Sequence, residues 1–458
     1  TADPTSVGRL PRRTAEALCI APLRKEDNTT VIAISNPFND DITSQTTFIY
    51  GSYVRFEVAP PSFIEILITY IYESNLEKQR KEKTGHSKSN EENEIPRLAR
   101  ALMTRALSMR ASDLHIQPFV GGGAVRMRID GILHRLVILP NAVNQSLIRY
   151  FKASSKMDPT NHLIAQDGRM EIEMDGRNCD LRLSTLPVTG GGEKLVIRFL
   201  GDSSSHGLEK SGLSTLEIQT LRRMASNTSG VVLLCGPTGS GKTTTLYSIL
   251  GELNNENVSI ATIENPVEFK MPGLAQTEVN DKAGLGFANA LRSILRQDPD
   301  VILIGEIRDA ETAQIAMQSA LTGHLVFSTL HTNDAPSAVT RLMELGVPGY
   351  LLNATLNGVL AQRLVRTLCP NCKTPDEHVP PERWTALIHP FNAPPPQTVY
   401  RPVGCLECRM TGYRGRAGIY ELLEVDDSIR QELAETRPGL DRIRRRAMKA
   451  GMKPLRLA

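Results

Sequence analysis

Apolar residues in the second half of the chain fall into short continuous runs separated by stretches with helical spacing. The runs cover residues 231–235, 259–263, 301–304 and 325–329. A continuous apolar run of this length is typical of a strand that is buried on both faces, as in a parallel sheet covered by helices. The pattern therefore predicts an α/β domain with a mostly parallel sheet.

Upstream of this domain, the pattern changes to one helix followed by strands. Apolar residues within 96–111 recur every three or four positions, which predicts an amphipathic helix. Strand-like runs follow at residues 113–117, 124–130, 170–174, 178–183 and 194–199. Gly121-Gly122-Gly123 suits a hairpin turn. We interpret residues 95–200 as a middle α+β domain.

The first segment, residues 1–72, has short alternating runs and a ten-residue apolar stretch over 63–72 that predicts a core helix. We interpret it as a small α+β partner-binding domain, truncated because the chain begins at Thr1 rather than Met. Residues 73–94 are almost free of apolar side chains and predict a charged linker. Residues 201–212 predict a hinge into the last domain, 213–458.

Composition narrows the class of protein. A chain of 458 residues is too long for one core, and 40% hydrophobic with 22% charged residues is typical of a soluble globular protein. The formal net charge of +3 gives no support to a dedicated nucleic-acid binder. No apolar stretch approaches the roughly 18 residues that span a bilayer. Without a signal peptide, we expect a cytoplasmic protein.

A phosphate-binding loop follows the run at 231–235. The sequence GPTGSGKT fits the pattern G-x-x-x-x-G-K-[ST], placed between a predicted strand and a predicted helix from Lys242 to about Leu253. Backbone N–H groups and Lys242 would hold the phosphates of a nucleoside triphosphate, and Thr243 would hold Mg²⁺. The candidate nucleotide-binding residues are Gly236, Pro237, Thr238, Gly239, Ser240, Gly241, Lys242, Thr243 and Thr244.

Acidic residues follow two further predicted strands. Glu306 comes after 301–304, where a carboxylate can activate the attacking water or hold Mg²⁺, although an ordinary strand-end acid is the alternative. Glu264 and Glu268 follow 259–263, at the edge where open α/β sheets bind ligands. Taken alone, that second group is more often an acidic turn than a site.

Histidines and arginines supply further candidates. His324 and His331 bracket the run 325–329, so they lie at opposite ends of a strand and cannot chelate one metal. A histidine at a nucleotide site can bind the γ-phosphate, and a structural role is the alternative. Hydrolysis of this kind often needs an arginine to neutralise transition-state charge. The arginines that could supply it are Arg126, Arg128, Arg169, Arg182, Arg198, Arg292 and Arg296, of which the last two lie four apart on a helix predicted over 287–297.

Four cysteines form two Cys-x-x-Cys pairs, Cys369 with Cys372 and Cys405 with Cys408. Two such pairs can give a tetrahedral four-sulfur site that favours Zn²⁺ or iron. We predict a structural zinc element over 369–408, with two redox-active pairs as the alternative. The remaining cysteines sit singly in apolar or strand patterns and are predicted core residues: Cys19, Cys179 and Cys235.

These motifs together resemble the ATPase family of type II secretion and type IV pilus assembly. The matching segments are GPTGSGKTTT, TIENPVEF, LRSILRQDPDVILIGEIRD and GHLVFSTLHTN, together with SDLHIQP, RMRIDG, QDGR and the CPNC…CLEC pair. The resemblance covers the chain from residue 95, and it is looser before that. It implies a RecA-like P-loop ATPase domain at the C-terminal end, a PAS-like α+β middle domain, a small α+β N-terminal domain and a Cys₄ zinc element.

The resemblance also implies roles for individual residues. Glu306 matches the catalytic glutamate, Glu264 and Glu268 the acidic box, His324 and His331 the histidine box, and Arg182 and Arg198 the arginines offered to nucleotide. Asn265 stands where the family usually has Asp, so one carboxylate is missing. The implied cofactors are ATP, Mg²⁺ and Zn²⁺.

The implied protein is a homo-hexameric motor attached peripherally to the inner membrane through platform and anchoring proteins, with no nucleic-acid partner. One alternative is a pilus-retraction ATPase, although that branch typically lacks the Cys₄ element and the extra N-terminal domain. A second alternative is a nucleotide-switched regulatory module without turnover, which Glu306 and the arginines disfavour. A GTPase is disfavoured because no N-K-x-D signature is present.

Overall fold

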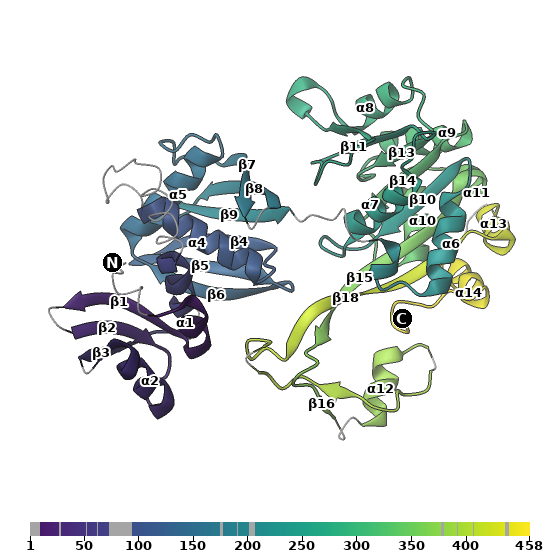
Figure 1. Cartoon of the computed structure of the whole chain (residues 1–458). Coiled ribbons are helices and arrows are strands. Elements are labelled where there is room, and N and C mark those ends of the chain that lie inside the picture. Colours follow the sequence, from purple (N-terminus) through teal and green to yellow (C-terminus); the bar gives the residue numbers. More distant parts are fainter. Residues whose placement is uncertain are drawn as a thin grey trace. The chain divides into compact units, whose positions relative to one another are not determined.

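The chain divides into two compact units, Thr1–Gly201 and Asp202–Ala458, which we describe separately (Figure 1). The computed structural model describes residues 10–26, 29–51, 53–61, 63–72, 94–174, 177–189, 191–200, 207–376, 380–391, 393–405, 407–435 and 439–458. Most of the predicted linker at 73–94 and the first half of the predicted hinge at 201–212 lie outside these residues. None of the described helices is long and apolar enough to cross a membrane.

The first unit begins with a three-stranded sheet of order β1-β2-β3, in which β2 pairs antiparallel with β1 and parallel with β3. The strands are β1 (Ile20–Glu26), β2 (Thr29–Ile34) and β3 (Val54–Val58). The helices are α1 (Arg12–Leu18), α2 (Asp40–Tyr50) and the predicted helix over 63–72. Asn39 caps α2 by accepting from the N–H groups of Asp41 and Ile42. Apolar faces of all these elements form one small core.

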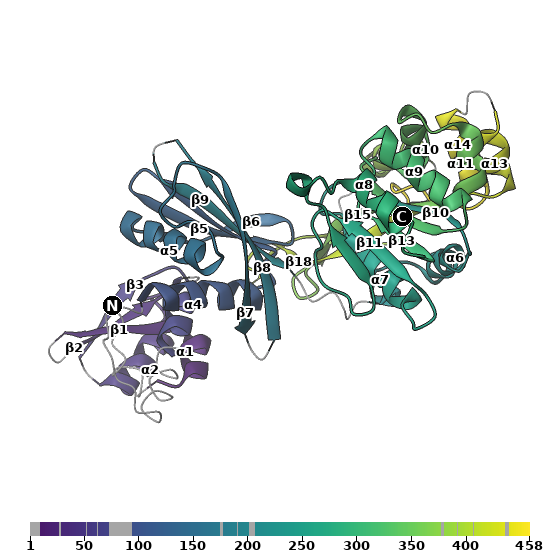
Figure 2. The ribbon, with the colours of Figure 1, turned by 90° about the horizontal axis from the view of Figure 1, so that it is seen from above.

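The rest of the first unit is a six-stranded antiparallel sheet of order β6-β5-β4-β9-β8-β7. Its strands are β4 (Asp113–Phe119), β5 (Gly122–Ile129), β6 (Ile132–Leu139), β7 (Gln166–Met174), β8 (Arg177–Pro187) and β9 (Glu193–Leu200). Helices α4 (Glu94–Ser108) and α5 (Asn141–Ser154) pack together against one face (Figure 2). Leu114 and Ile116 of β4 point into this core, so the alternating residues, including Asp113, face the other side.

The second unit contains a seven-stranded sheet of order β12-β11-β13-β14-β10-β15-β18. The strands are β10 (Gly230–Cys235), β11 (Ile260–Glu264), β12 (Ala275–Glu278), β13 (Val301–Ile304), β14 (Leu325–Leu330), β15 (Leu356–Leu368) and β18 (Tyr413–Glu424). All neighbouring pairs are parallel except β15 with β18. Every residue of β10 is buried, as the continuous apolar run predicts.

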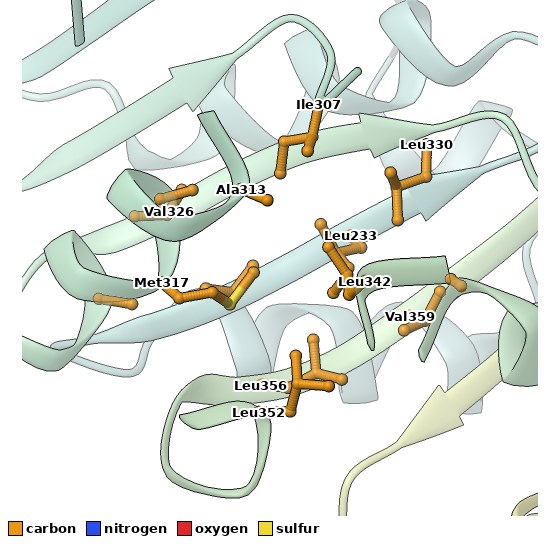
Figure 3. Close-up of a cluster of buried hydrophobic side chains, with 14 of the residues drawn as sticks. Leu233, Ile307, Ala313, Met317, Val326, Leu330, Leu342, Leu352, Leu356 and Val359 are labelled. Atoms are coloured by element: carbon orange, nitrogen blue, oxygen red, sulfur yellow. The ribbon is translucent and has the colours of Figure 1, made fainter. Parts of the chain in front are cut away.

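Helices cover both faces of this sheet and create two cores. Leu233 of β10 faces one core with Val326 of β14 and Met317, as Figure 3 shows, whereas Leu234 faces the other core with Leu246. The first core is covered by α8 (Phe287–Ile294), α9 (Ala310–Leu321), α10 (Ala335–Glu344), α11 (Gly349–Thr355), α13 (Asp427–Leu433) and α14 (Leu440–Lys449). The second core is covered by α6 (Thr215–Ala225) and α7 (Lys242–Leu253).

The predicted α/β class with a mostly parallel sheet agrees with this fold, and some elements differ in extent. The helix predicted over 287–297 ends at Ile294, because residues 295–297 form a tighter turn. The sequence patterns did not identify β1, β6, β12, β15 or β18. β12 has only four residues and none of them is buried, so it carries no apolar signal.

Candidate nucleotide site and four-cysteine cluster

The predicted phosphate-binding loop joins a buried strand to a helix. β10 ends at Cys235 and α7 begins at Lys242, so residues 236–241 turn the chain at the carboxyl edge of the sheet. Open α/β sheets bind their ligands at this edge. The first N–H groups of α7 have no partner within the helix and are available to an anion. Thr243 is exposed, so its hydroxyl is accessible to a metal ion beside that anion.

The Lys242 side chain folds against the loop that precedes it. Its Nζ donates to the carbonyl oxygens of Gly236 at 2.7 Å and of Pro237 at 3.1 Å. Burial lowers the pKa of this ammonium, and the negative charge of Glu306 opposes that shift. The loop therefore holds a mostly buried cation that the phosphates of a nucleotide would stabilise.

The loop rests on Gln362 of β15. Gln362 Oε1 accepts a 2.9 Å hydrogen bond from the Thr245 hydroxyl of α7, and both side chains are buried. A Cβ on Gly236 would lie 2.4 Å from the Gln362 carbonyl oxygen, and one on Gly241 would lie 2.7 Å from its Nε2. Sequence reasoning missed Gln362, because its contacts come from residues more than a hundred positions away.

Replacing Gln362 by alanine should weaken ATP binding about tenfold. The change leaves the buried Thr245 hydroxyl without its acceptor, which costs about 1–3 kcal/mol, and opens space beneath the loop. Titration of the purified protein with ATP measures the dissociation constant. Arg366→Ala, an exposed position further along β15, is the control and should bind ATP normally. An unchanged constant in Gln362→Ala would show that the loop does not need this support.

Glu306 follows β13 and lies beside two basic side chains. Arg308 Nε is 2.6 Å from Glu306 Oε2, and His331 Nε2 is 3.6 Å from the same oxygen. The Glu306 side chain is only 13% exposed. Strands β13, β14 and β10 are consecutive in the sheet, so Glu306, His331 and the loop share its carboxyl edge. The structure thus brings these three predicted features together.

His324 lies at the other end of β14, as the sequence predicts. Its Nδ1 is 2.9 Å from the carbonyl oxygen of Ser319 at the end of α9. That bond ties the histidine to the turn before the strand, whereas His331 follows the strand at the sheet edge that carries the phosphate-binding loop. The two histidines therefore have different surroundings.

The two glutamates of the acidic turn, Glu264 and Glu268, differ in their exposure to solvent. Glu264 is 4% exposed, and its carboxylate accepts hydrogen bonds from the hydroxyls of Tyr247 and Thr262. Glu268 is partly exposed. Asn265, which replaces the family's Asp, is exposed between them. Tyr247 is a second residue that sequence reasoning missed, since no motif connects it with Glu264.

The arginines of the first unit form a row across its sheet. Arg169, Arg182 and Arg198 are paired in register on β7, β8 and β9, and Arg198 is paired with Asp113 of β4. The Arg198 Nε is 3.0 Å from the Asp113 carboxylate. For Arg182, no acidic partner lies within ion-pair distance in the part of the chain that the structure describes. In the second unit, Arg292 pairs with Glu311 at 2.5 Å.

The four predicted metal ligands form a cluster in which all sulfurs lie within 4.8 Å of one another. Sγ distances are 3.8 Å for Cys369–Cys405 and 3.7 Å for both Cys372–Cys408 and Cys405–Cys408. Four sulfurs at about 2.3 Å from a tetrahedral zinc ion are about 3.8 Å apart. A disulfide would need about 2.05 Å, so the geometry fits a metal site rather than oxidised pairs.

Backbone donors prepare this cluster for a cation. The N–H groups of Cys405 and Gly412 each lie 3.2 Å from Cys408 Sγ, and that of Gly404 lies 3.3 Å from Cys372 Sγ. Burial raises the pKa of the Cys408 thiol, but these donors and the neighbouring thiols lower it overall to about 6, whereas burial raises the pKa of the Cys372 thiol to about 11. A thiolate is the form that binds zinc.

Comparison with known proteins identifies the family. Residues 88–457 match the family model described as type II/IV secretion system protein, and residues 1–78 match the MshEN domain. The chain belongs to the type II/IV secretion system protein family. The resemblance stated from the motifs is thereby confirmed.

Relatives of this secretion-family protein carry the names of assembly and secretion ATPases. The type IV pilus assembly ATPase TfpB of Acinetobacter baylyi is 44% identical over 366 residues, which are 80% of this chain and 62% of that protein. The type II secretion system ATPase E of Vibrio cholerae is 44% identical over 77% of this chain and 69% of its own length. The type IV pilus assembly ATPase PilB of Myxococcus xanthus is 37% identical over all of this chain and 84% of its own length. The chain thus spans 62% to 84% of these relatives.

Solved structures support the fold. The solved structure of the ATPase DotB from Legionella pneumophila aligns over 78% of this chain and 88% of its own chain, with a TM-score of 0.58 and 23% identity. At this identity the likeness supports the fold and nothing further. The pilus retraction motor PilT with bound ADP covers 77% of this chain and 93% of its own, with a TM-score of 0.50 and 25% identity. The secretion-family protein therefore has the predicted P-loop ATPase fold.

Proposed function

We propose that this protein hydrolyses ATP to drive type II protein secretion or type IV pilus assembly. One observation carries the proposal: a phosphate-binding loop with a buried lysine shares a sheet edge with Glu306 and His331. A bound triphosphate and a water-activating carboxylate are the two requirements of phosphoryl hydrolysis. The relatives named as secretion and pilus assembly ATPases indicate what the energy serves.

In this proposal the phosphate-binding loop binds ATP, and Glu306 activates the attacking water. The backbone N–H groups of the loop and of the first turn of α7, apart from Pro237, which has none, and the Lys242 ammonium would hold the phosphates. Thr243 would hold Mg²⁺, which would neutralise charge on the phosphate oxygens. Glu306 accepts the proton of the attacking water. His331 donates a hydrogen bond to the γ-phosphate.

Arginines and the acidic turn complete the proposed site. Arg182 and Arg198 compensate the negative charge that develops on the transferred phosphoryl group. Arg198 would have to exchange its contact with Asp113 for this role, whereas Arg182 needs no such exchange. Glu268 is the acid of the turn that is accessible to magnesium or water, and Glu264 supports the turn from its buried position.

The proposed assembly is a homo-hexamer on the cytoplasmic side of an inner membrane, bound there through platform and anchoring proteins. Residues 1–72 would contact a partner, 95–200 would offer arginines, and 213–458 would form the ATPase domain with zinc in the Cys₄ element. A retraction motor is the second candidate, favoured by the likeness to PilT at 25% identity. Type IV pilus assembly ATPases and type II secretion system proteins match at 37–46% identity, which favours the first candidate.

The hydrolysis rate per subunit should rise with protein concentration. In a ring, a neighbouring subunit can complete each site, so dilution to monomers removes activity as well as the ring. Steady-state ATP hydrolysis measured alongside light-scattering mass tests this expectation. A rate per subunit that stays constant in a monomeric sample would contradict the ring. Absence of hydrolysis at every concentration would favour the regulatory module instead.

A further inference from the structure

The buried carboxylate of Glu264 is held by side chains from three separate elements. Tyr247 of α7 donates to Oε2, and Thr262 of β11 donates to Oε1 at 2.6 Å. Gln276 of β12 approaches Oε1 at 3.4 Å. For Glu264 to reach a metal ion or a water at the carboxyl edge of the sheet, these hydrogen bonds would have to break. Breaking them in a buried environment costs free energy. The carboxylate therefore serves as an anchor in this arrangement.

Tyr247 connects that anchor to the phosphate-binding helix. It follows Thr243 by four residues, so the two side chains lie on the same face of α7, one turn apart. The tyrosine is 3% exposed, and its ring packs on Phe269 with centroids 4.0 Å apart. Phe269 directly follows Glu268, the last residue of the acidic turn. One side chain thus contacts both ends of the turn.

The phenol remains a hydrogen-bond donor at neutral pH. Burial and the adjacent Glu264 carboxylate raise the pKa of Tyr247, so its hydroxyl keeps the proton that it donates. Gln276 Nε2 lies 3.4 Å from the phenol oxygen and 3.2 Å from the carbonyl oxygen of Phe269. The network therefore extends from α7 into the segment after the turn.

We propose that Tyr247 is a positioning residue that fixes the acidic turn, and with it Glu268, relative to Thr243 and the phosphate-binding loop. It acts chiefly through its bond to the Glu264 carboxylate, beside a backbone contact with Glu268, and it does not touch the reacting atoms. The proposal rests on the proposed ATP hydrolysis. A turn that is held by the loop's own helix keeps its carboxylate at a constant distance from the bound triphosphate, and misplacement of about 1 Å can cost about a hundredfold in rate.

Tyr247→Phe is the test, because it removes the hydroxyl and keeps the ring against Phe269. We expect kcat for ATP hydrolysis to fall about tenfold while KM for ATP changes less than about twofold, since the phosphate contacts of the loop remain. Tyr350→Phe on α11, where the tyrosine is 72% exposed, is the matched control and should behave as wild type. Rates are compared at one protein concentration, well below each melting temperature, where every variant is fully folded.

A double-variant cycle identifies the route of the effect. If Tyr247 acts through Glu264, adding Tyr247→Phe to Glu264→Gln should lower kcat less than about twofold further. Multiplicative losses would overturn the proposal, as would a normal kcat in Tyr247→Phe or a raised KM with kcat unchanged. A wild-type protein without ATP hydrolysis would contradict the proposed function itself. Failure of the proposed function can therefore be distinguished from failure of the proposal about Tyr247.

Discussion

Glu306→Gln should bind ATP with nearly unchanged affinity and lose hydrolysis by a factor of about 10² to 10⁴. Glutamine has the same size and shape, so it leaves the loop and Lys242 in place. Its amide cannot accept the proton of the attacking water at neutral pH. Glu306 also lies 2.6 Å from Arg308, but that arginine is 67% exposed, so losing the ion pair has little effect on stability.

Two measurements on the same sample of Glu306→Gln test this prediction. ATP binding is measured by titration, and hydrolysis by release of inorganic phosphate. Glu311→Gln is a suitable control, because Glu311 also pairs with an arginine but is 60% exposed on α9. We expect that control to hydrolyse ATP normally. Wild-type turnover in Glu306→Gln would assign water activation to another group, for which Glu268 is the next candidate.

The features of this site that could be predicted from the sequence are those formed by contiguous residues. The loop from 236 to 243 and the acid after β13 could be identified because a glycine-rich turn and a strand-end carboxylate have local signatures. Fully buried strands such as β10 and β14 gave equally clear apolar runs. The α/β class follows from the alternation of these runs with helices.

The missed part depends on contacts between distant segments. Gln362 supports the loop from β15, and Tyr247 bonds to Glu264 across 17 positions, so neither forms a pattern along the chain. β15 and β18 are long, but no residue of 363–368 in β15 or of 413–419 in β18 is buried, so their apolar pattern is interrupted. The ion pair between Arg198 and Asp113 could not be predicted for the same reason, because the two residues are 85 positions apart in the sequence.

We expect the segment that carries the four-cysteine cluster to depend on a bound metal, because of its position in the fold. β15 ends at Leu368, directly before Cys369, and β18 begins at Tyr413, shortly after Cys408. The segment between them contains α12 (Pro381–Ile388) and a two-stranded sheet of β16 (Thr374–Pro375) and β17 (Tyr400–Arg401) (Figure 1).

The described residues of this segment have almost no core of their own. Among the described residues from 369 to 408, the buried apolar side chains are Cys369, Ile388 and Cys408. Leu387, Tyr400 and Val403 are each more than 40% exposed. So little buried apolar surface cannot offset the loss of chain entropy on ordering some forty residues, and a metal ion is one of the few sources of stability available to it.

Purified protein should therefore contain one zinc ion per chain, and Cys408→Ser should lose it. Apparent binding free energies of structural zinc are about 10–16 kcal/mol in small domains, so losing the ion should unfold the segment and lower the melting temperature. Elemental analysis gives the metal content, and proteolysis should newly cleave within 369–408 while sparing the β10–β14 core. Cys179→Ser, outside the cluster, should keep both zinc and stability. Full zinc content in Cys408→Ser, or a metal-free wild type whose segment resists protease, would show that the cluster is not a structural metal site.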